Sequence, residues 1–267
     1  MITLASFLAE NARPTYERIA GYVAAQVGQP AQLLAGVTLE ERHRMLDEGR
    51  VQVAFICGLP YSQKFDRPDR PVELLVAPAM SPERYRGQPI YFTDVIVRRD
   101  SPFRSFADLR GKAWAYNTEE SNSGYNMPRD HLLRLGETSG FFGRTVASGA
   151  HQTSIRMVLE GAVDAAGIDG LVLDMELKLR PELAPQLRII ESIGPYPIPP
   201  VVVSSGVAEG LKARLREVFV AMHEDPDGRA ILADGLIARF VEVRDTHYDP
   251  IRQMVRRAEA AGFLTLR

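Results

Sequence analysis

Short apolar runs and amphipathic stretches alternate along the first quarter of the chain. Residues 2–8, 32–35 and 51–57 are apolar runs of strand length, and residues 14–27 and 38–48 carry apolar side chains at helical spacing. This order of strand, helix, strand, helix, strand predicts a parallel sheet with right-handed crossovers. Ligands of such sheets lie beyond the carboxyl ends of the strands.

The stretch from 112 to 135 combines a buried strand, a polar break and an amphipathic helix. Residues 112–116 are apolar enough for a strand, and residues 125–135 carry apolar side chains at helical spacing. The helix opens on the run Ser121-Asn122-Ser123-Gly124. Because a helix N-terminus presents free backbone N–H groups and a partial positive charge, this stretch predicts an anion site. An ordinary Ser or Asn helix cap is the alternative.

The α/β pattern continues to the end of the chain and predicts two lobes. The chain leaves the first lobe near residues 92–97 and returns near residues 199–204. We expect lobe I to comprise residues 1–93 and 201–267, and lobe II residues 94–200, each a mostly parallel sheet flanked by helices. Two extended crossings of this kind predict a hinge, with a ligand bound between the lobes.

Composition narrows the class of protein and of partner. Of 267 residues, 45% are apolar and 25% charged, and the formal net charge is −2 with no basic run. This balance argues against nucleic acid or an anionic membrane as the partner. No apolar stretch approaches the roughly 20 residues that span a bilayer, so we expect no direct membrane insertion. The single cysteine, Cys57, lies in an apolar run and is expected to be a packed thiol.

Several short motifs resemble a known family in their order and spacing. They are Gly58-Leu59-Pro60-Tyr61, Arg98-Arg99-Asp100-Ser101-Pro102, Ser121-Asn122-Ser123-Gly124-Tyr125, Ser148-Gly149-Ala150-His151 and residues 158–166. Over nearly the whole chain they resemble the phosphonate/phosphite/phosphate-type solute-binding proteins of ABC transporters. The resemblance implies a type II periplasmic binding fold, a small oxyanion ligand captured by hinge closure, and an ABC transporter membrane permease as partner. It implies neither a cofactor nor a metal.

The resemblance also implies a set of ligand-binding residues. Carried over by position, the oxyanion ligands are Ser121, Asn122, Ser123 and His151. Their chemistry agrees, because hydrogen bonds to an oxyanion are charge-assisted and imidazole can donate one near neutral pH. Tyr61 and Tyr91 would close the site from the first lobe and the hinge, although a tyrosine in a turn, as predicted for Tyr61, is more often a surface residue.

Three features depart from the family pattern or qualify it. Asn122 stands where the family usually has threonine, and Glu119-Glu120 precedes the site, where we expect both carboxylates to face solvent. Family members that bind aminoalkyl phosphonates carry a carboxylate in the segment corresponding to residues 197–200, and this chain has none there. We therefore expect a ligand without a distal ammonium group. Asp169 is a candidate for facing the cleft, with a helix cap as the alternative.

These observations predict a binding protein and not an enzyme. The chain has no Gly-x-Ser-x-Gly, His-Glu-x-x-His, P-loop or Gly-x-Gly-x-x-Gly motif. A cytosolic ligand sensor and a small-molecule enzyme on the same fold are the alternatives.

The first residues of the chain do not have the pattern of a signal peptide. We therefore expect a periplasmic protein if an export signal has been removed, and a cytoplasmic one if the chain is complete as written.

Overall fold

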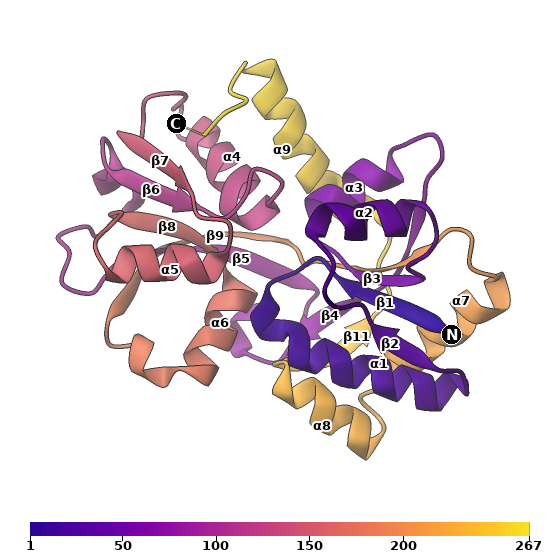
Figure 1. Ribbon diagram of the computed structural model, residues 1–267. Helices are drawn as coiled ribbons and strands as arrows, with labels where there is room; N and C mark the ends of the chain where they lie inside the picture. Colours follow the sequence, from indigo (N-terminus) through magenta and orange to yellow (C-terminus); the bar gives the residue numbers. More distant parts are fainter. Residues whose placement is uncertain (267) are drawn as a thin grey trace. The chain divides into compact units, whose positions relative to one another are not determined.

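The strands of the chain form two β-sheets, one in each of two units (Figure 1). The computed structural model describes residues 1–266. Unit 1 comprises Met1–Ile90 and Pro197–Asp249, and unit 2 comprises Tyr91–Tyr196 together with the described chain from Pro250 onwards. We expected residues 201–267 in the first lobe, whereas the structure groups the segment after Asp249 with unit 2.

Unit 1 contains a six-stranded sheet. Its strands are β1 (Ile2–Ser6), β2 (Ala31–Leu33), β3 (Val53–Phe55), β4 (Val72–Met80), β10 (Val201–Ser204) and β11 (Ile237–Val241), in the order β11-β4-β10-β3-β1-β2. β1 pairs in parallel with β2 and β3, but β10 runs antiparallel to both β3 and β4, and β11 antiparallel to β4. The sheet is therefore mixed and not mostly parallel, because the strands formed after the chain returns run against β3 and β4.

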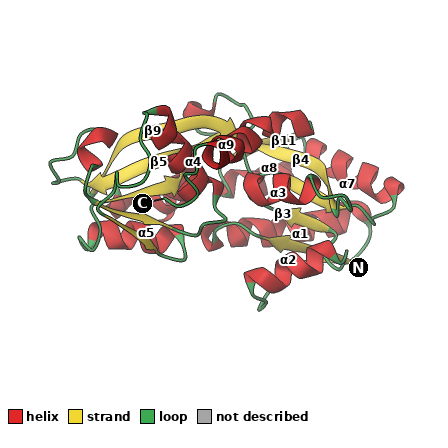
Figure 2. Cartoon of the chain, turned by 90° about the horizontal axis from the view of Figure 1, so that it is seen from above, coloured by secondary structure: helices red, strands yellow, loops and turns green. Residues whose placement is uncertain are grey.

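Helices surround the strands of unit 1 (Figure 2). They are α1 (Arg13–Val27), α2 (Leu39–Asp47), α3 (Gly58–Phe65), α7 (Glu209–Ala221) and α8 (Pro226–Asp234). α1 has Pro14 in its first turn and ends at Gly28, which adopts a left-handed φ of 70°. α2 begins at Thr38, whose hydroxyl accepts from the Glu41 amide at 3.2 Å.

Unit 2 contains a five-stranded sheet in the order β7-β6-β8-β5-β9. The strands are β5 (Ile90–Arg98), β6 (Ala113–Tyr116), β7 (Arg144–Ala147), β8 (Ala165–Asp169) and β9 (Leu187–Pro197). β6 pairs in parallel with β7 and β8, and β5 runs antiparallel to β8. The carboxyl ends of β6, β7 and β8 consequently lie along one edge of the sheet.

The helices of unit 2 follow these strands. They are α4 (Met127–Arg134), α5 (His151–Leu159), α6 (Gly170–Leu179) and α9 (Asp249–Ala260). α5 lies against β6 and β8 (Figure 1). The core holds Trp114, which is fully buried and stacks on Phe142 with 4.8 Å between the ring centroids. α9 belongs to this unit because Arg257 pairs with the buried Asp130 of α4 at 2.6 Å.

Short helical turns complete both units. They are the 3-10 turns η1 (Glu10–Ala12), η2 (Glu83–Tyr85), η3 (Phe106–Leu109), η5 (Pro181–Leu183) and η6 (Asp245–Tyr248), and the π-helical turn η4 (Asn122–Asn126).

Two predicted segments take a different local structure. The expected turn at residues 58–61 forms the start of α3, since a proline is tolerated in the first turn of a helix. The proline-rich segment that begins at Gly194 continues β9 as far as Pro197. β9 lies at the edge of its sheet, where a proline costs no ladder hydrogen bond.

Candidate functional site

Six of the seven predicted site residues lie in unit 2, most of them near the carboxyl ends of three parallel strands. η4 follows β6, α5 follows β7 and α6 follows β8. Because these strands end at one edge of the sheet, Ser123 of η4, His151 of α5 and Asp169 at the end of β8 come together there. Tyr61 is the exception and belongs to unit 1.

The Ser123 hydroxyl lies at the centre of the cluster, near polar atoms of the other three side chains. It donates to Asp169 Oδ2 at 3.1 Å and lies 3.4 Å from His151 Nε2. The hydroxyl of Ser121 lies 3.5 Å from it. All four side chains are buried, so each hydrogen bond among them is stronger than it would be in water.

The π-helical turn η4 orients polar groups toward this cluster. Ser121 caps the turn, and its hydroxyl accepts from the Gly124 amide at 2.9 Å, which leaves its proton to donate elsewhere. The amide of Asn126 donates to the Ser121 carbonyl at 3.1 Å. The backbone N–H groups of Asn122 and Ser123 lie at the N-terminus of the turn. No carbonyl within the turn is placed to accept a hydrogen bond from them.

Gly124 is required by a close approach of side chains. A Cβ at this position would lie 2.0 Å from Asn117 Oδ1 and 3.3 Å from His151 Cε1. The first distance is far below van der Waals contact. The absence of a side chain at Gly124 therefore lets η4 pack directly against Asn117 and His151.

Asn122 of η4 forms a hydrogen bond with Tyr91 of β5. Asn122 Nδ2 donates to the Tyr91 hydroxyl at 2.8 Å, and its Oδ1 accepts from Asn126 Nδ2 at 2.9 Å. Both Asn122 and Tyr91 are fully buried. Thus the structure uses both ends of the Asn122 amide to support η4, and the donors that Asn122 retains are its backbone N–H and the second Nδ2–H.

Tyr61 lies in α3 and not in the turn that the sequence predicts. It is fully buried, and its hydroxyl donates to Asp245 Oδ1 at 2.7 Å. Its ring packs edge-on against Tyr248 with centroids 4.8 Å apart. These contacts account for the side chain as part of the packing of unit 1.

Burial shifts the two titratable groups of the cluster in opposite directions. It lowers the pKa of His151 to about 4, and the Gly167 backbone opposes this only in part. It raises the pKa of Asp169 to about 7, against the lowering effect of the hydrogen bonds from Leu171 and Ser123. Near neutral pH the imidazole is therefore uncharged, and the carboxyl is close to half protonated.

Two buried polar atoms beside Gly124 have no hydrogen-bond partner of normal geometry among residues 1–266. They are Asn117 Oδ1 and His151 Nδ1. Asn117 was missed by the sequence analysis, although its position directly after β6 is a signal that could have found it. Glu119 and Glu120 are exposed, as expected.

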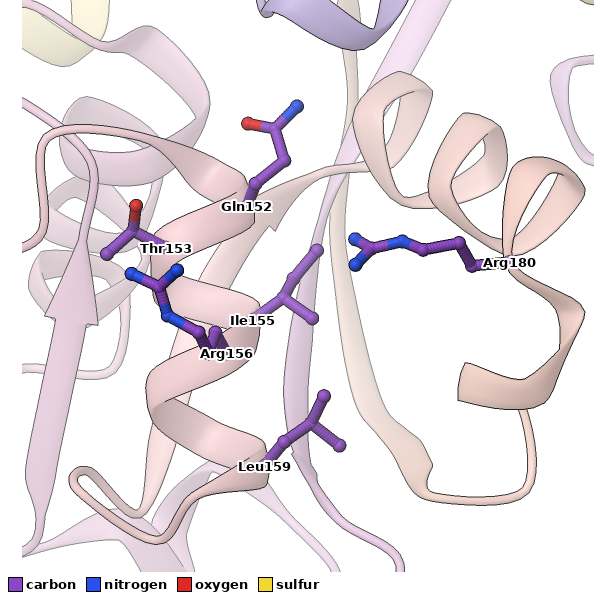
Figure 3. A pocket seen from close by; sticks show the side chains of 6 residues that line it. All are labelled: Gln152, Thr153, Ile155, Arg156, Leu159 and Arg180. Atoms are coloured by element: carbon purple, nitrogen blue, oxygen red, sulfur yellow. The ribbon is translucent and has the colours of Figure 1, made fainter.

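A separate hollow opens between α5 and the end of α6 (Figure 3). Its volume is about 180 Å³, and it is lined by Gln152, Thr153, Ile155, Arg156, Leu159 and Arg180. In Figure 3 the Arg180 side chain extends toward α5. None of the predicted site residues lines this hollow.

Residues 1–266 contain neither a metal-binding cluster nor a membrane-spanning helix. No group of three or more His, Cys, Asp or Glu side chains in that range is arranged to hold a metal ion. Nor does any helix within it combine the length and the apolar character needed to cross a bilayer.

Comparison with known proteins assigns the family. Residues 1–248 match the family model described as ABC transporter, phosphonate, periplasmic substrate-binding protein. A phosphonates-binding periplasmic protein of Escherichia coli is 28% identical over 181 residues, which cover 66% of this chain and 53% of that protein. The chain thus aligns with about half the length of this relative.

Two solved structures share the fold over nearly the whole chain. A binding protein component of an ABC phosphonate transporter from Pseudomonas aeruginosa has a TM-score of 0.84 at 20% identity, covering 97% of this chain and 88% of that one. PhnD1 from Prochlorococcus marinus, in complex with methylphosphonate, has a TM-score of 0.83 at 16% identity, covering 97% and 98%. The fold is therefore the two-sheet type II periplasmic binding fold. With the family model covering residues 1–248, the chain belongs to the periplasmic substrate-binding proteins of phosphonate ABC transporters.

Proposed function

We propose that this protein binds a small phosphonate, phosphite or phosphate-like oxyanion through Ser121, Ser123 and His151 of unit 2. The observation that carries the proposal is the convergence of the Ser123 hydroxyl on His151 Nε2 and on Asp169 within one buried cluster. Hydroxyl and imidazole N–H groups are the donors that a tetrahedral oxyanion needs, and its negative charge makes their hydrogen bonds strong.

The open backbone amides of η4 add to this donor set. The N–H groups of Asn122 and Ser123 stand at the start of a helical segment that continues into α4, where anions are favoured. Asp169 in its protonated form adds a further donor, and in its ionised form it would repel the ligand. We therefore infer that binding of a given anion weakens as Asp169 loses its proton.

The proposal includes a ligand without a distal ammonium group. Residues 197–200 read Pro-Ile-Pro-Pro and supply no carboxylate. Asp169 already accepts from Ser123 and from the Leu171 amide at 2.9 Å. A compact anion such as methylphosphonate or phosphite suits this cluster better than an aminoalkyl phosphonate does.

Membership of the family supports a role in uptake. We propose that the protein works outside the cytoplasmic membrane and presents its ligand to the permease of an ABC transporter. The cytosolic sensor and the enzyme are less favoured, because the matching relatives are described as binding proteins. Incubation with methylphosphonate followed by phosphorus NMR tests the further proposal that the ligand is not turned over, and a new phosphorus signal formed in proportion to protein would contradict it.

Titration calorimetry of the purified chain tests the binding proposal. The panel comprises methylphosphonate, phosphite, phosphate and a short alkyl sulfonate, and we expect at least one Kd in the micromolar range or below. Ser123→Ala should weaken binding by roughly tenfold or more, since a hydrogen bond to a charged group contributes about 1.5–3 kcal/mol. Ser204→Ala is the matched control, a buried serine of unit 1. The proposal fails if nothing in the panel binds more tightly than millimolar.

A further inference from the structure

The chain after Asp249 is hydrogen-bonded to η4 and to α4, the helix that follows it. The hydroxyl of Tyr125, the residue after Gly124, accepts from the Leu266 amide at 2.9 Å and donates to the Leu264 carbonyl at 3.4 Å. Arg129, one turn later, donates from Nη1 to the same carbonyl at 2.7 Å. Its guanidinium carbon lies over the Tyr125 ring, 5.4 Å from the centroid.

A continuous set of hydrogen bonds leads from this contact to the start of η4. Arg129 Nη2 donates to Asn126 Oδ1 at 2.9 Å. The bonds already described connect Asn126 to Asn122, and Asn122 to the Tyr91 hydroxyl. Asn126 Nδ2 also lies 3.6 Å from the Met254 sulfur of α9. Because each amide in the series uses its carbonyl and its NH₂, breaking one bond leaves a buried group unsatisfied.

Arg129 connects the segment after Asp249 to η4 without a salt bridge. It forms no ion pair with any carboxylate of residues 1–266, and its strong hydrogen bonds go to a main-chain carbonyl and a side-chain amide. Burial lowers the pKa of the guanidinium, against the raising effect of Tyr125 and Asp130. A half-buried arginine held by neutral oxygens serves geometry more than charge neutralisation, since its planar fork fixes the two acceptors relative to each other.

We propose that residues 254–266 are a positioning element for the anion-binding turn, acting through Tyr125, Arg129 and Asn126. The effect on affinity rests on the proposed function. A π-helical turn is less stable than an α-helix, and it keeps its geometry only when surrounding contacts determine it. The hydrogen bonds that the Leu264 carbonyl and the Met254 sulfur accept, and that the Leu266 amide donates, supply those contacts. The amides and hydroxyls of η4 are therefore held in place before an anion arrives.

Hydrogen exchange on the ligand-free protein tests the positioning directly. Three amides report on the turn: Gly124, which donates to the Ser121 hydroxyl, Asn126, which donates to the Ser121 carbonyl, and Met127, which donates to the Asn122 carbonyl. We expect Arg129→Met to speed their exchange by roughly tenfold or more, because local opening then costs less. Arg156→Met, on another helix of unit 2 with a mostly exposed side chain that pairs with the exposed Glu160, is the matched control and should leave the three rates unchanged.

Ligand binding gives the second readout. For methylphosphonate we expect Arg129→Met to raise Kd by roughly tenfold, chiefly through faster dissociation, and Arg129→Lys to recover part of the loss. Tyr125→Phe removes a single hydroxyl and provides a milder variant should Arg129→Met fail to fold. Unchanged exchange at the three amides in a folded Arg129→Met or Tyr125→Phe protein would overturn the inference. Should the wild type bind no oxyanion, the proposed function fails, and the exchange rates still decide whether the segment positions η4.

Discussion

Ser123 contacts two buried titratable side chains, His151 and Asp169. Their contributions to the stability of the folded state depend on pH in opposite directions. The pKa of His151 is lowered to about 4, so the folded state resists a proton that the unfolded state accepts below about pH 6.5. The pKa of Asp169 is raised to about 7, so the folded state keeps a proton that the unfolded state releases above about pH 4. Stability therefore rises with pH through His151 and falls with pH through Asp169, over nearly the same interval.

Single variants should separate these two effects. Without ligand, His151→Asn removes the increase in the free energy of unfolding that His151 causes as pH rises. The stability of this variant relative to wild type should therefore fall by about 3 kcal/mol between about pH 4 and 6.5. Asp169→Asn should show the reverse, with relative stability increasing from about pH 4 to 7 by about 4 kcal/mol. Urea unfolding at several pH values gives the difference curves. Parallel curves for the variants and wild type would contradict the assigned shifts.

Gly124 permits a second prediction. Gly124→Ala should destabilise the protein by about 2 kcal/mol and weaken oxyanion binding, because the new methyl group must displace Asn117 Oδ1. Gly21→Ala is the control. It lies in the middle of α1 with no atom within 4 Å of the added Cβ, and should be neutral or stabilise by up to about 1 kcal/mol. Equal midpoints of thermal unfolding for the two variants would contradict the packing described for the site.

Much of the candidate site could be predicted from residue type and position, and its internal connections could not. Ser121, Ser123 and His151 were identified by motif and Asp169 by its place at a strand end, and the structure brings these four together. No sequence pattern indicates that Asn122 binds Tyr91, because the two are 31 residues apart and meet only through tertiary packing. For the same reason Tyr61 was expected in a turn and lies buried in α3.

At the scale of elements, capping residues in the sequence indicate where a helix begins and ends, but the sequence does not indicate whether it is an α-helix or a π-helix. Pro14 and Gly28 mark the limits of α1, and Thr38 the start of α2, through side-chain and backbone chemistry within a few residues. The π-helical geometry of η4 leaves no such mark, since its apolar spacing differs little from that of an α-helix. It depends on hydrogen bonds to Tyr91 and to the segment after Asp249.

The contact between α4 and α9 gives a prediction at this scale. The Asp130 carboxylate, only 1% exposed, pairs with Arg257 at 2.6 Å and with Arg134 at 2.8 Å. Asp130→Asn should destabilise unit 2 by about 3 kcal/mol, because it leaves two guanidinium groups without their buried counter-charge. Asp100→Asn breaks the exposed pair with Arg98 and should change the urea midpoint by no measurable amount. Similar losses in both variants would contradict this account.

For the whole molecule, the sequence predicts that the chain leaves the first lobe near residue 93 and returns near residue 201, and the compact units of the structure divide at Tyr91 and Pro197. The prediction places the residues after Asp249 in the first lobe, whereas the structure groups them with unit 2. The sequence of an amphipathic helix shows which face the helix buries and not which partner covers that face. Asp130 and Tyr125, the residues that hold it, lie more than 120 positions away.

Trp114 makes unit 2 separately observable. It is the single tryptophan and is fully buried in this unit, so its fluorescence reports on unit 2 alone. A ligand at 100 times its Kd should stabilise the folded state by about 2.7 kcal/mol and raise the midpoint of the fluorescence-detected transition. Methylphosphonate is the ligand to use, with sodium chloride at equal ionic strength as the control. A midpoint unmoved by a ligand that calorimetry shows to bind would contradict the placement of the site in unit 2.

The grouping of residues after Asp249 with unit 2 bears on how the chain matures during translation. After the first part of unit 1 the ribosome makes Tyr91–Tyr196, then the second part of unit 1, and only afterwards the segment that supplies Arg257, Leu264 and Leu266. The candidate turn η4 must therefore wait while some fifty intervening residues are added, with Asp130 lacking Arg257 and the Tyr125 hydroxyl lacking its contacts with Leu264 and Leu266. A polypeptide released early, at Asp249, would hold every residue of the candidate cluster and still lack the contacts that Leu264 and Leu266 make with Tyr125 and Arg129.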